Sequence, residues 1–162
     1  MKVFKYLLLS LVAFLSCSLI VQKDASPVFD FENVLTESQE NNLYKIIVAH
    51  EAKTSNEIAI VTTPDWGDKE NALFYSVDFA NNHGVGKKEK DNGIVIVFSK
   101  QQRETRISTG YGMEEILKDH IAKKIIDSLM IPQFKEGKIY EGLLVGTNEI
   151  VRFLELPENK IH

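Results

Sequence analysis

Two stretches of the chain are apolar at every position, and a helical pattern separates them. Residues 58–61 (Ile-Ala-Ile-Val) and 94–98 (Ile-Val-Ile-Val-Phe) indicate strands buried on both faces. Residues 70–82 carry apolar side chains at helical spacing, and Gly84-Val85-Gly86 follows as a stop signal. A strand, a crossover helix and a second strand in this order predict a parallel β-α-β unit.

The second apolar stretch is also predicted to open a hairpin. Residues 94–98 and 105–109 are typical of two strands, and the polar loop 100–104 joins them. The two strands should therefore run antiparallel. If the loop is centred near Gln101 and Gln102, the pairing places Asp91 roughly opposite Gly112.

A helix is predicted before the first buried strand. Thr36 and Gln39 have the spacing of a capping box, in which each side chain bonds the backbone of the other residue. The positions that follow place four residues on one face: Leu43, Ile46, Ile47 and His50. We interpret His50 as a residue at the edge of this packed stripe and not as a metal ligand, because of its periodic position.

The last part of the chain is predicted to be helical. Apolar periodicity favours one helix over residues 120–130, stopped by Pro132, and another over residues 140–154. Helices before, between and after strands imply a three-layer α/β/α sandwich with a mixed sheet. Residues 26–156 have the length of a single domain, and residues 157–162 should form a frayed tail.

The N-terminal residues predict a secretory leader. Lys2 and Lys5 precede the apolar run 6–21, which is shorter than a membrane span normally requires. Residues 1–25 are therefore assigned to a signal peptide or lipoprotein leader, with an uncleaved anchor as the alternative. Cys17, the only cysteine, follows a relaxed form of the bacterial lipoprotein box. We expect an extracytoplasmic domain, periplasmic or anchored to the cell envelope.

The negative net charge of the domain argues against one class of binding partner. The full chain has a formal charge of −4, and removing the leader deletes three lysines and one aspartate, which leaves −6. This acidity disfavours nucleic-acid binding, which needs a basic surface. No cysteine remains for an internal disulfide. We expect a monomer that meets the membrane only through its leader and has an envelope protein as a candidate partner.

Several carboxylates should gather where the hairpin strands meet the neighbouring loops. Asp91, Glu114 and Asp119 would share one rim, and Asn92 would add an amide oxygen. Hard cations prefer such oxygen ligands, and the lack of a Cys or His cluster argues against zinc. The sequence therefore predicts a divalent cation site, with calcium favoured over magnesium. A phosphate site on the glycines is a weaker interpretation, because the acidic residues repel an anion.

Each of these residues also has a structural interpretation. Asp91-Asn92-Gly93 is a common turn sequence. Asp119 is placed to cap the helix that follows it, and Glu114 and Glu115 favour a helix N-terminus. Only their convergence on one rim favours a cation. Asp65 and Asp68 should lie at the opposite end of the sheet.

A series of short motifs resembles the TPM domain family from about Val28 to Phe153. Two departures are a missing tryptophan before Gly84 and Lys118 in place of a threonine. The motifs are Val28-Phe29-Asp30 through Val34-Leu35-Thr36, Asn82-His83-Gly84-Val85-Gly86, Asp91-Asn92-Gly93-Ile94, Gly110-Tyr111-Gly112-Met113-Glu114, Leu117-Lys118-Asp119, and Ile131-Pro132-x-Phe134 followed by Gly137-x-x-Tyr140-Glu141-Gly142-Leu143.

The resemblance implies an α/β/α domain outside the cytoplasm, calcium binding in some members and a phosphatase-like label. It also raises Asp30 as a metal ligand, although the predicted topology puts Asp30 nearer the other end of the sheet. The full set of candidate metal ligands is Asp91, Glu114, Asp119 and Asp30.

Three functions remain open at this point. The first is a binding or stabilising module that takes calcium, and the second is a metal-assisted phosphomonoesterase. The third is a structural or chaperone-like factor without metal. No catalytic residue is assigned, because His120 is the one candidate for acid-base chemistry and a surface role is more common for it. The arginines available to clamp a phosphate are Arg103, Arg106 and Arg152.

Overall fold

The computed structural model describes residues 26–159, so the predicted leader with Cys17 lies outside the described residues. No helix in this part of the chain has the length and apolar character needed to cross a membrane. The elements are β1 (Val28–Asp30), α2 (Glu37–Thr54), β2 (Glu57–Thr62), α3 (Ala72–His83), β3 (Gly93–Ser99), β4 (Glu104–Thr109), the turn η1 (Tyr111–Met113), α4 (Asp119–Ile125), the turn η2 (Ile126–Met130), α5 (Ile131–Lys135), α6 (Ile139–Leu154) and the turn η3 (Pro157–Asn159).

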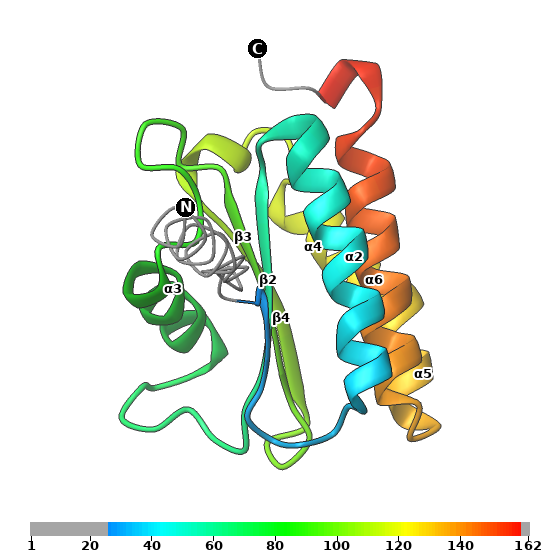
Figure 1. Ribbon diagram of the computed structural model, residues 1–162. Helices are drawn as coiled ribbons and strands as arrows, with labels where there is room; N and C mark the ends of the chain where they lie inside the picture. The colour runs from blue at the N-terminus through cyan, green and yellow to red at the C-terminus, as the bar shows by residue number, and fades with distance from the viewer. Residues whose placement is uncertain (1–25, 160–162) are drawn as a thin grey trace, which may run out of the picture.

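The sheet has four strands in the order β1-β2-β3-β4 (Figure 1). β2 runs parallel to both β1 and β3, whereas β4 runs antiparallel to β3. This arrangement confirms the predicted β-α-β unit, the hairpin and the mixed sheet. β1 was not predicted, because three residues are too few to show a strand period.

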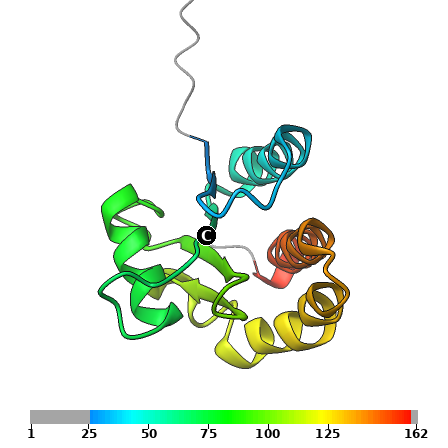
Figure 2. The ribbon, with the colours of Figure 1, turned by 90° about the horizontal axis from the view of Figure 1, so that it is seen from below.

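Two apolar cores lie on the two faces of the sheet. Successive strand residues point to opposite faces, so β2 and β3 contribute to both cores. Ala59, Val61, Val95 and Val97 pack beneath α3, and Ile58, Ile60, Ile94 and Ile96 pack beneath the other helices. The end-on view shows α3 on one side and α2, α4, α5 and α6 on the other (Figure 2). The chain is thus a single α/β/α domain, and both cores lie within residues 28–154.

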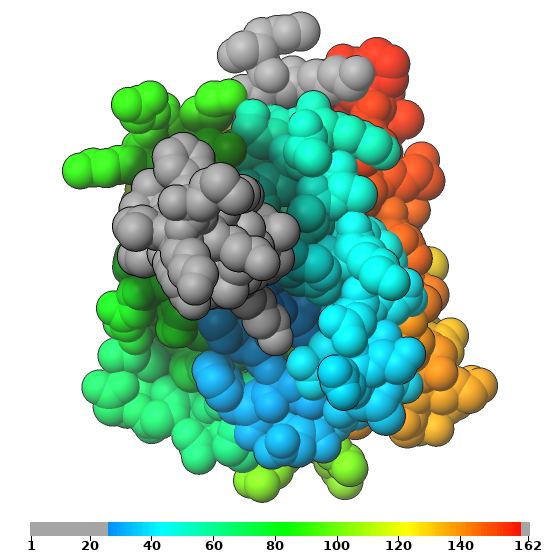
Figure 3. All heavy atoms as spheres, in the orientation of Figure 1, coloured from blue at the N-terminus to red at the C-terminus, as the bar shows by residue number. Residues whose placement is uncertain are grey.

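The start of α2 forms as the sequence predicts. The Thr36 hydroxyl accepts the Gln39 N–H at 3.3 Å, and the Gln39 side chain accepts the Thr36 N–H at 2.9 Å. This capping box fixes the point where the chain leaves β1 and enters the helix. In the surface view the segment after β1 lies directly beside the beginning of α2 (Figure 3).

The predicted stop at Pro132 is wrong, because the helix continues through it. After α4 the backbone widens into the π turn η2, in which the Ile131 N–H donates to the Ile126 carbonyl. Pro132 then stands in the first turn of α5. A proline costs little there, since the first N–H groups of a helix lack internal partners.

The predicted C-terminal tail begins with the turn η3, which is held by a 2.8 Å hydrogen bond from the Asn159 side chain to the Phe153 carbonyl.

His50 links α2 to the end of α6. The imidazole is 1% exposed, and its Nδ1 lies 3.2 Å from Glu155 Oε1. Burial lowers the pKa of His50, and this outweighs the opposing attraction of Glu155. The hydrogen bond with His50 in turn lowers the pKa of Glu155. A neutral imidazole that donates to an ionised carboxylate is consistent with both pKa shifts. The predicted place of His50 on the packed face of α2 is confirmed, but the residue is fully buried and not at the edge of the stripe.

This pair is expected to make the fold less stable in acid. Because the folded pKa of His50 lies below its unfolded value of about 6.5, the stabilisation is present above that pH and is lost as the pH falls towards the folded pKa. Urea midpoints should therefore be lower at pH 5.5 than at pH 7.5, whereas His50→Gln should be less stable at pH 7.5 and show a smaller difference between the two. An unchanged pH dependence in His50→Gln would assign the acid sensitivity to other groups.

Candidate functional site

The hairpin brings two loops together at one end of the sheet. The register pairs Ile94 with Thr109, and beyond it the Gly110 N–H donates to the Gly93 carbonyl at 2.8 Å. One step further, the Gly112 N–H donates to the Asp91 carbonyl at 3.1 Å. The predicted position of Asp91 opposite Gly112 is confirmed. We call residues 85–93 and 110–119, which lie around this contact, the rim.

The glycines of the rim are required by the close approach of three backbone segments. A Cβ on Gly112 would lie 1.9 Å from the Lys90 carbonyl oxygen, and one on Gly110 would lie 2.3 Å from that of Asp91. A Cβ on Gly93 would lie 2.3 Å from the Val85 carbonyl oxygen. Real Cβ atoms do not approach so closely, so these positions exclude any side chain. The Gly-Tyr-Gly motif therefore builds the rim itself.

Asn92 holds the rim from inside the protein. Its side chain is fully buried, and its Oδ1 accepts the Lys87 N–H at 2.9 Å. Its Nδ2 donates to the Ser55 carbonyl at 2.7 Å and to Asn56 Oδ1 at 3.2 Å. The amide oxygen that the sequence suggested for a cation is thus engaged with the backbone. Asn92 ties the loop before β3 to the end of α2.

The three carboxylates predicted for this end of the sheet are exposed. Asp91 adopts a left-handed backbone conformation with φ +47°, and Glu114 follows η1. Within residues 26–159, Asp91, Glu114 and Asp119 form no ion pair with a basic side chain. In the same range no group of three or more His, Cys, Asp or Glu side chains is close enough to hold a metal ion. The rim therefore offers hard oxygen donors that are not arranged as a preformed cage.

Asp119 and His120 stand at the start of α4. Lys118 is the N-cap residue and makes no capping hydrogen bond, and Asp119 is the first helical residue. The alternative interpretation of Asp119 as a cap that accepts backbone hydrogens is therefore not realised. His120 is exposed on the same turn. Asp119 retains only the general preference of a carboxylate for a helix N-terminus.

Asp30 lies at the other end of the sheet, where the predicted topology put it. It pairs with Thr62, the last residue of β2, and its carboxylate accepts the Thr62 hydroxyl. It also accepts the N–H groups of Val34 at 3.1 Å and Leu35 at 2.8 Å. Asp65 follows β2 at this same end and caps its own turn through the Gly67 N–H at 2.8 Å. Asp30 therefore organises the turn into α2.

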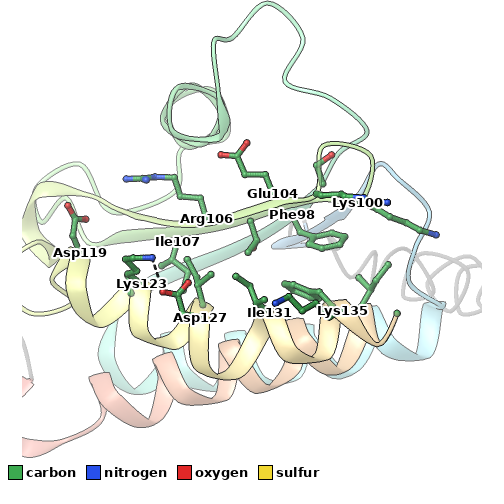
Figure 4. Close-up of a pocket in the computed structure, with 18 residues that line it drawn as sticks. Phe98, Lys100, Glu104, Arg106, Ile107, Asp119, Lys123, Asp127, Ile131 and Lys135 are labelled. Atoms are coloured by element: carbon green, nitrogen blue, oxygen red, sulfur yellow. Dashed lines mark hydrogen bonds and ion pairs between the residues drawn. The ribbon is translucent and has the colours of Figure 1, made fainter.

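A groove that the sequence did not predict runs between β4 and the helical segment from α4 to α5. It encloses about 1140 Å³, and Figure 4 shows the side chains that line it. Asp119 lies at one end and is the one candidate ligand that lines the groove. β4 is an edge strand in the sheet of residues 26–159, so only one of its edges has a partner, and no sequence pattern indicated this position.

The arginines considered for a phosphate clamp are dispersed. Arg103 lies in the loop between β3 and β4 and lines the groove. The Arg106 Nε donates to the Ser108 hydroxyl at 3.1 Å. Arg152 on α6 forms a two-pronged ion pair with Glu149, at 2.8 and 2.7 Å. Arg152 is thus occupied away from the rim and the groove.

Comparison with known proteins identifies the family. Residues 28–153 match the TPM domain, and no curated protein sequence matches the chain. The N-terminal domain of a protein from P. gingivalis is 30% identical, with a TM-score of 0.76 over 88% of this chain and 90% of that one.

Two further solved structures share the fold. The BA42 protein from the psychrophilic bacterium Bizionia argentinensis is 22% identical, with a TM-score of 0.64 over 76% of this chain and 83% of that one. The N-terminal domain of the cg2496 protein from Corynebacterium glutamicum is 12% identical, with a TM-score of 0.63 over 81% of each chain. The family match spans most of the chain and agrees with the order of motifs from Val28 to Phe153, so the protein belongs to the TPM domain family.

Proposed function

We propose that this chain is an extracytoplasmic binding module whose rim takes a divalent cation, with calcium favoured over magnesium. One observation carries the proposal. The Gly112–Asp91 hydrogen bond joins the loops that bear Asp91 and Glu114, and the second loop leads to Asp119 at the start of α4. All three carboxylates are exposed and have no basic partner among residues 26–159. Carboxylates left free in this way are suited to an external cation.

The arrangement of the donors favours weak binding of calcium. Calcium accepts six to eight oxygens in flexible geometry and includes water among them, whereas magnesium demands a near-octahedral set. The exposed side chains of Asp91, Glu114 and Asp119 have to turn towards a common ion, because they do not form a close group beforehand. This convergence costs side-chain entropy. We therefore expect a dissociation constant of about 0.1 to 1 mM, as in extracellular modules.

The proposed location agrees with such an affinity. An envelope domain behind a secretory leader meets calcium at higher concentrations than a cytoplasmic sensor does, and a weak site is useful there. Cation binding would stiffen the two loops and offer a defined surface to an envelope protein. Hydrolysis of phosphomonoesters is the alternative. It is less well supported, because the candidate general acid His120 is exposed and Arg152 is bound to Glu149.

Calcium is expected to raise the melting temperature of the chain from Ser26 onwards. At ten times the dissociation constant, a ligand that binds only the folded state adds about 1.4 kcal/mol, which corresponds to roughly 5 °C for a domain of this size. Magnesium should give a smaller shift. Asp91→Asn combined with Asp119→Asn should abolish the calcium shift, and asparagine suits position 91 because it tolerates the left-handed conformation.

A matched variant separates a site from a general effect of charge. Asp68→Asn combined with Glu70→Gln also removes two negative charges, but from exposed positions in the loop between β2 and α3, at the other end of the sheet. This control should keep the calcium shift. An equal loss in both double variants, or no shift for the wild type at several times 1 mM, would contradict the cation site.

A further inference from the structure

β4 presents an open edge of backbone hydrogen-bonding groups. The bond from the Gly110 N–H to the Gly93 carbonyl fixes which residue pairs of the β3–β4 ladder are hydrogen-bonded. Such pairs alternate, so the N–H and C=O groups of Thr105, Ile107 and Thr109 point away from β3. Within residues 26–159 no backbone hydrogen bond from another element reaches them. An unpaired edge of this kind is a template for another strand.

The groove described above lies directly against this edge. Ile107 of β4 and Phe98 of β3 form one apolar wall, and Ile126, Ile131 and Phe134 of η2 and α5 form the other. The rings of Phe98 and Phe134 meet with centroids 4.6 Å apart and, together with the buried Ile107, close the groove at its base. Figure 4 shows Phe98, Ile107 and Ile131 between the strand and the helix, below the open edge. A strand placed along β4 would point alternate side chains into this apolar space.

The charges along the groove are not evenly distributed. Five basic and three acidic residues line it, although the whole chain is acidic. Lys123 and Asp127 pair with each other at 2.7 Å. Lys100, Arg103 and Lys135, which we call the basic end, form no ion pair with the described residues and lie where the hairpin loop meets the end of α5. Asp119 lies at the opposite end (Figure 4).

We propose that the edge of β4 and its groove bind an extended peptide segment of another protein. The segment adds to the sheet as a fifth strand, with alternate apolar side chains in the groove and acidic residues at its C-terminal end. Antiparallel pairing is the more stable kind, and because β4 runs from the basic end towards Asp119, this orientation places the C-terminal end of the segment at the basic end. Main-chain bonds supply affinity, and the groove and charges supply specificity.

Charge complementarity favours this occupant over a second copy of the chain. In a two-fold pairing of β4 edges, the basic end of one copy would meet the Asp119 end of the other, where a single acidic groove residue faces three basic ones. A peptide with several acidic residues matches the basic end more completely. An acidic peptide neutralises Lys100, Arg103 and Lys135 instead.

The test uses the chain from Ser26 onwards, which contains both cores, with chelator present so that the cation site does not contribute. The probe is a fluorescein-labelled octapeptide with valine at alternate positions and two C-terminal aspartates. Fluorescence anisotropy should show saturable binding. Exchanging the aspartates for lysines should weaken it about tenfold or more, and Arg103→Glu combined with Lys135→Glu should do the same to the original peptide. These two residues are exposed, so the fold should persist.

Backbone pairing is tested on the peptide and leaves the protein unchanged. Two versions of the peptide carry the same number of N-methyl groups. In the first, the methylated residues are those whose N–H groups face β4, and in the second they are the residues in between. Only the first should lose binding, since a strand bonds its neighbour through alternate residues. Equal binding by both versions, an unchanged affinity in the charge-reversed protein, or no binding at about 1 mM peptide would overturn the proposal. So would a dimer that Thr109→Pro dissociates, because a second copy would then hold the edge.

Discussion

Replacing Gly112 by alanine is expected to lower the free energy of unfolding by about 3 kcal/mol or more, at the upper end of the cost of overpacking. The added Cβ would lie 1.9 Å from the Lys90 carbonyl oxygen and 3.2 Å from that of Asp91. Both neighbours are backbone atoms, so no side chain can rotate out of the way. The loops have to separate, and the hydrogen bond from Gly112 to Asp91 is lost with them.

Urea unfolding followed by circular dichroism measures this effect. Gly93→Ala should behave in the same way, because its Cβ would meet the Val85 carbonyl oxygen at 2.3 Å. Gly67→Ala is the matched control. It adds a methyl group where no atom lies within 4 Å, and only its φ of +60° opposes alanine, which costs roughly 1 to 2 kcal/mol. A loss in Gly112→Ala no larger than that in Gly67→Ala would contradict the close packing of the rim.

Exchanging Asn92 for aspartate, a change of one atom, is expected to cost about 3 kcal/mol. The new carboxylate still accepts the Lys87 N–H, but it faces the Ser55 carbonyl and Asn56 Oδ1 with an oxygen where the amide had donors. The site is fully buried, so water cannot separate the acceptors. The loop before β3 should detach from the end of α2.

Asn71 provides the control for this substitution. It is the N-cap of α3, where its side-chain oxygen accepts the N–H groups of Leu73 and Phe74. Aspartate is an equally good cap, so Asn71→Asp should change the stability by less than about 0.5 kcal/mol. Thermal melts of the two variants compare the same chemical change at two sites. Similar melting temperatures for both would show that the amide donors of Asn92 do not hold the rim.

Local patterns were sufficient to predict most of the fold. The apolar runs of β2 and β3 predicted buried strands, because both faces of those strands are covered by helices. The approximate register of the hairpin could be predicted, since a short loop leaves few alternatives, and the structure confirms the pairing of Asp91 with Gly112. The capping box of Thr36 and Gln39 is equally local.

Features that depend on distant contacts were not predictable in this way. The partner of Asn92 is the Ser55 carbonyl, 37 residues earlier, and the partner of His50 is Glu155, 105 residues later. The sequence pattern predicted that the helix ends at Pro132, but the π turn η2 lets the helix continue through that residue. The groove beside β4 exists because α4, η2 and α5 pack next to an unpaired edge. No single segment contains that information.

For the candidate carboxylates, the sequence predicted the position of the backbone but not the arrangement of the side chains. The sequence brought Asp91 and Glu114 to loops that do lie at one end of the sheet, because the hairpin register is local. It could not determine whether the side chains approach one another, since exposed carboxylates are oriented by rotamers and not by the backbone pattern. Asp30 was implied by resemblance, and its carboxylate is engaged with Thr62 and the turn into α2.

A calcium titration of the chain from Ser26 onwards, followed by heteronuclear NMR, tests the proposed cation site most directly. Each backbone amide reports on its own surroundings, so the spectrum locates the ion as well as detecting it. The predicted result is a set of saturable chemical-shift changes at the rim, in residues 85–93 and 110–119. Calcium should produce them more strongly than magnesium, and Asp91→Asn combined with Asp119→Asn should remove them. Shifts spread over the acidic surface without saturation, or a silent rim at several times 1 mM calcium, would contradict it.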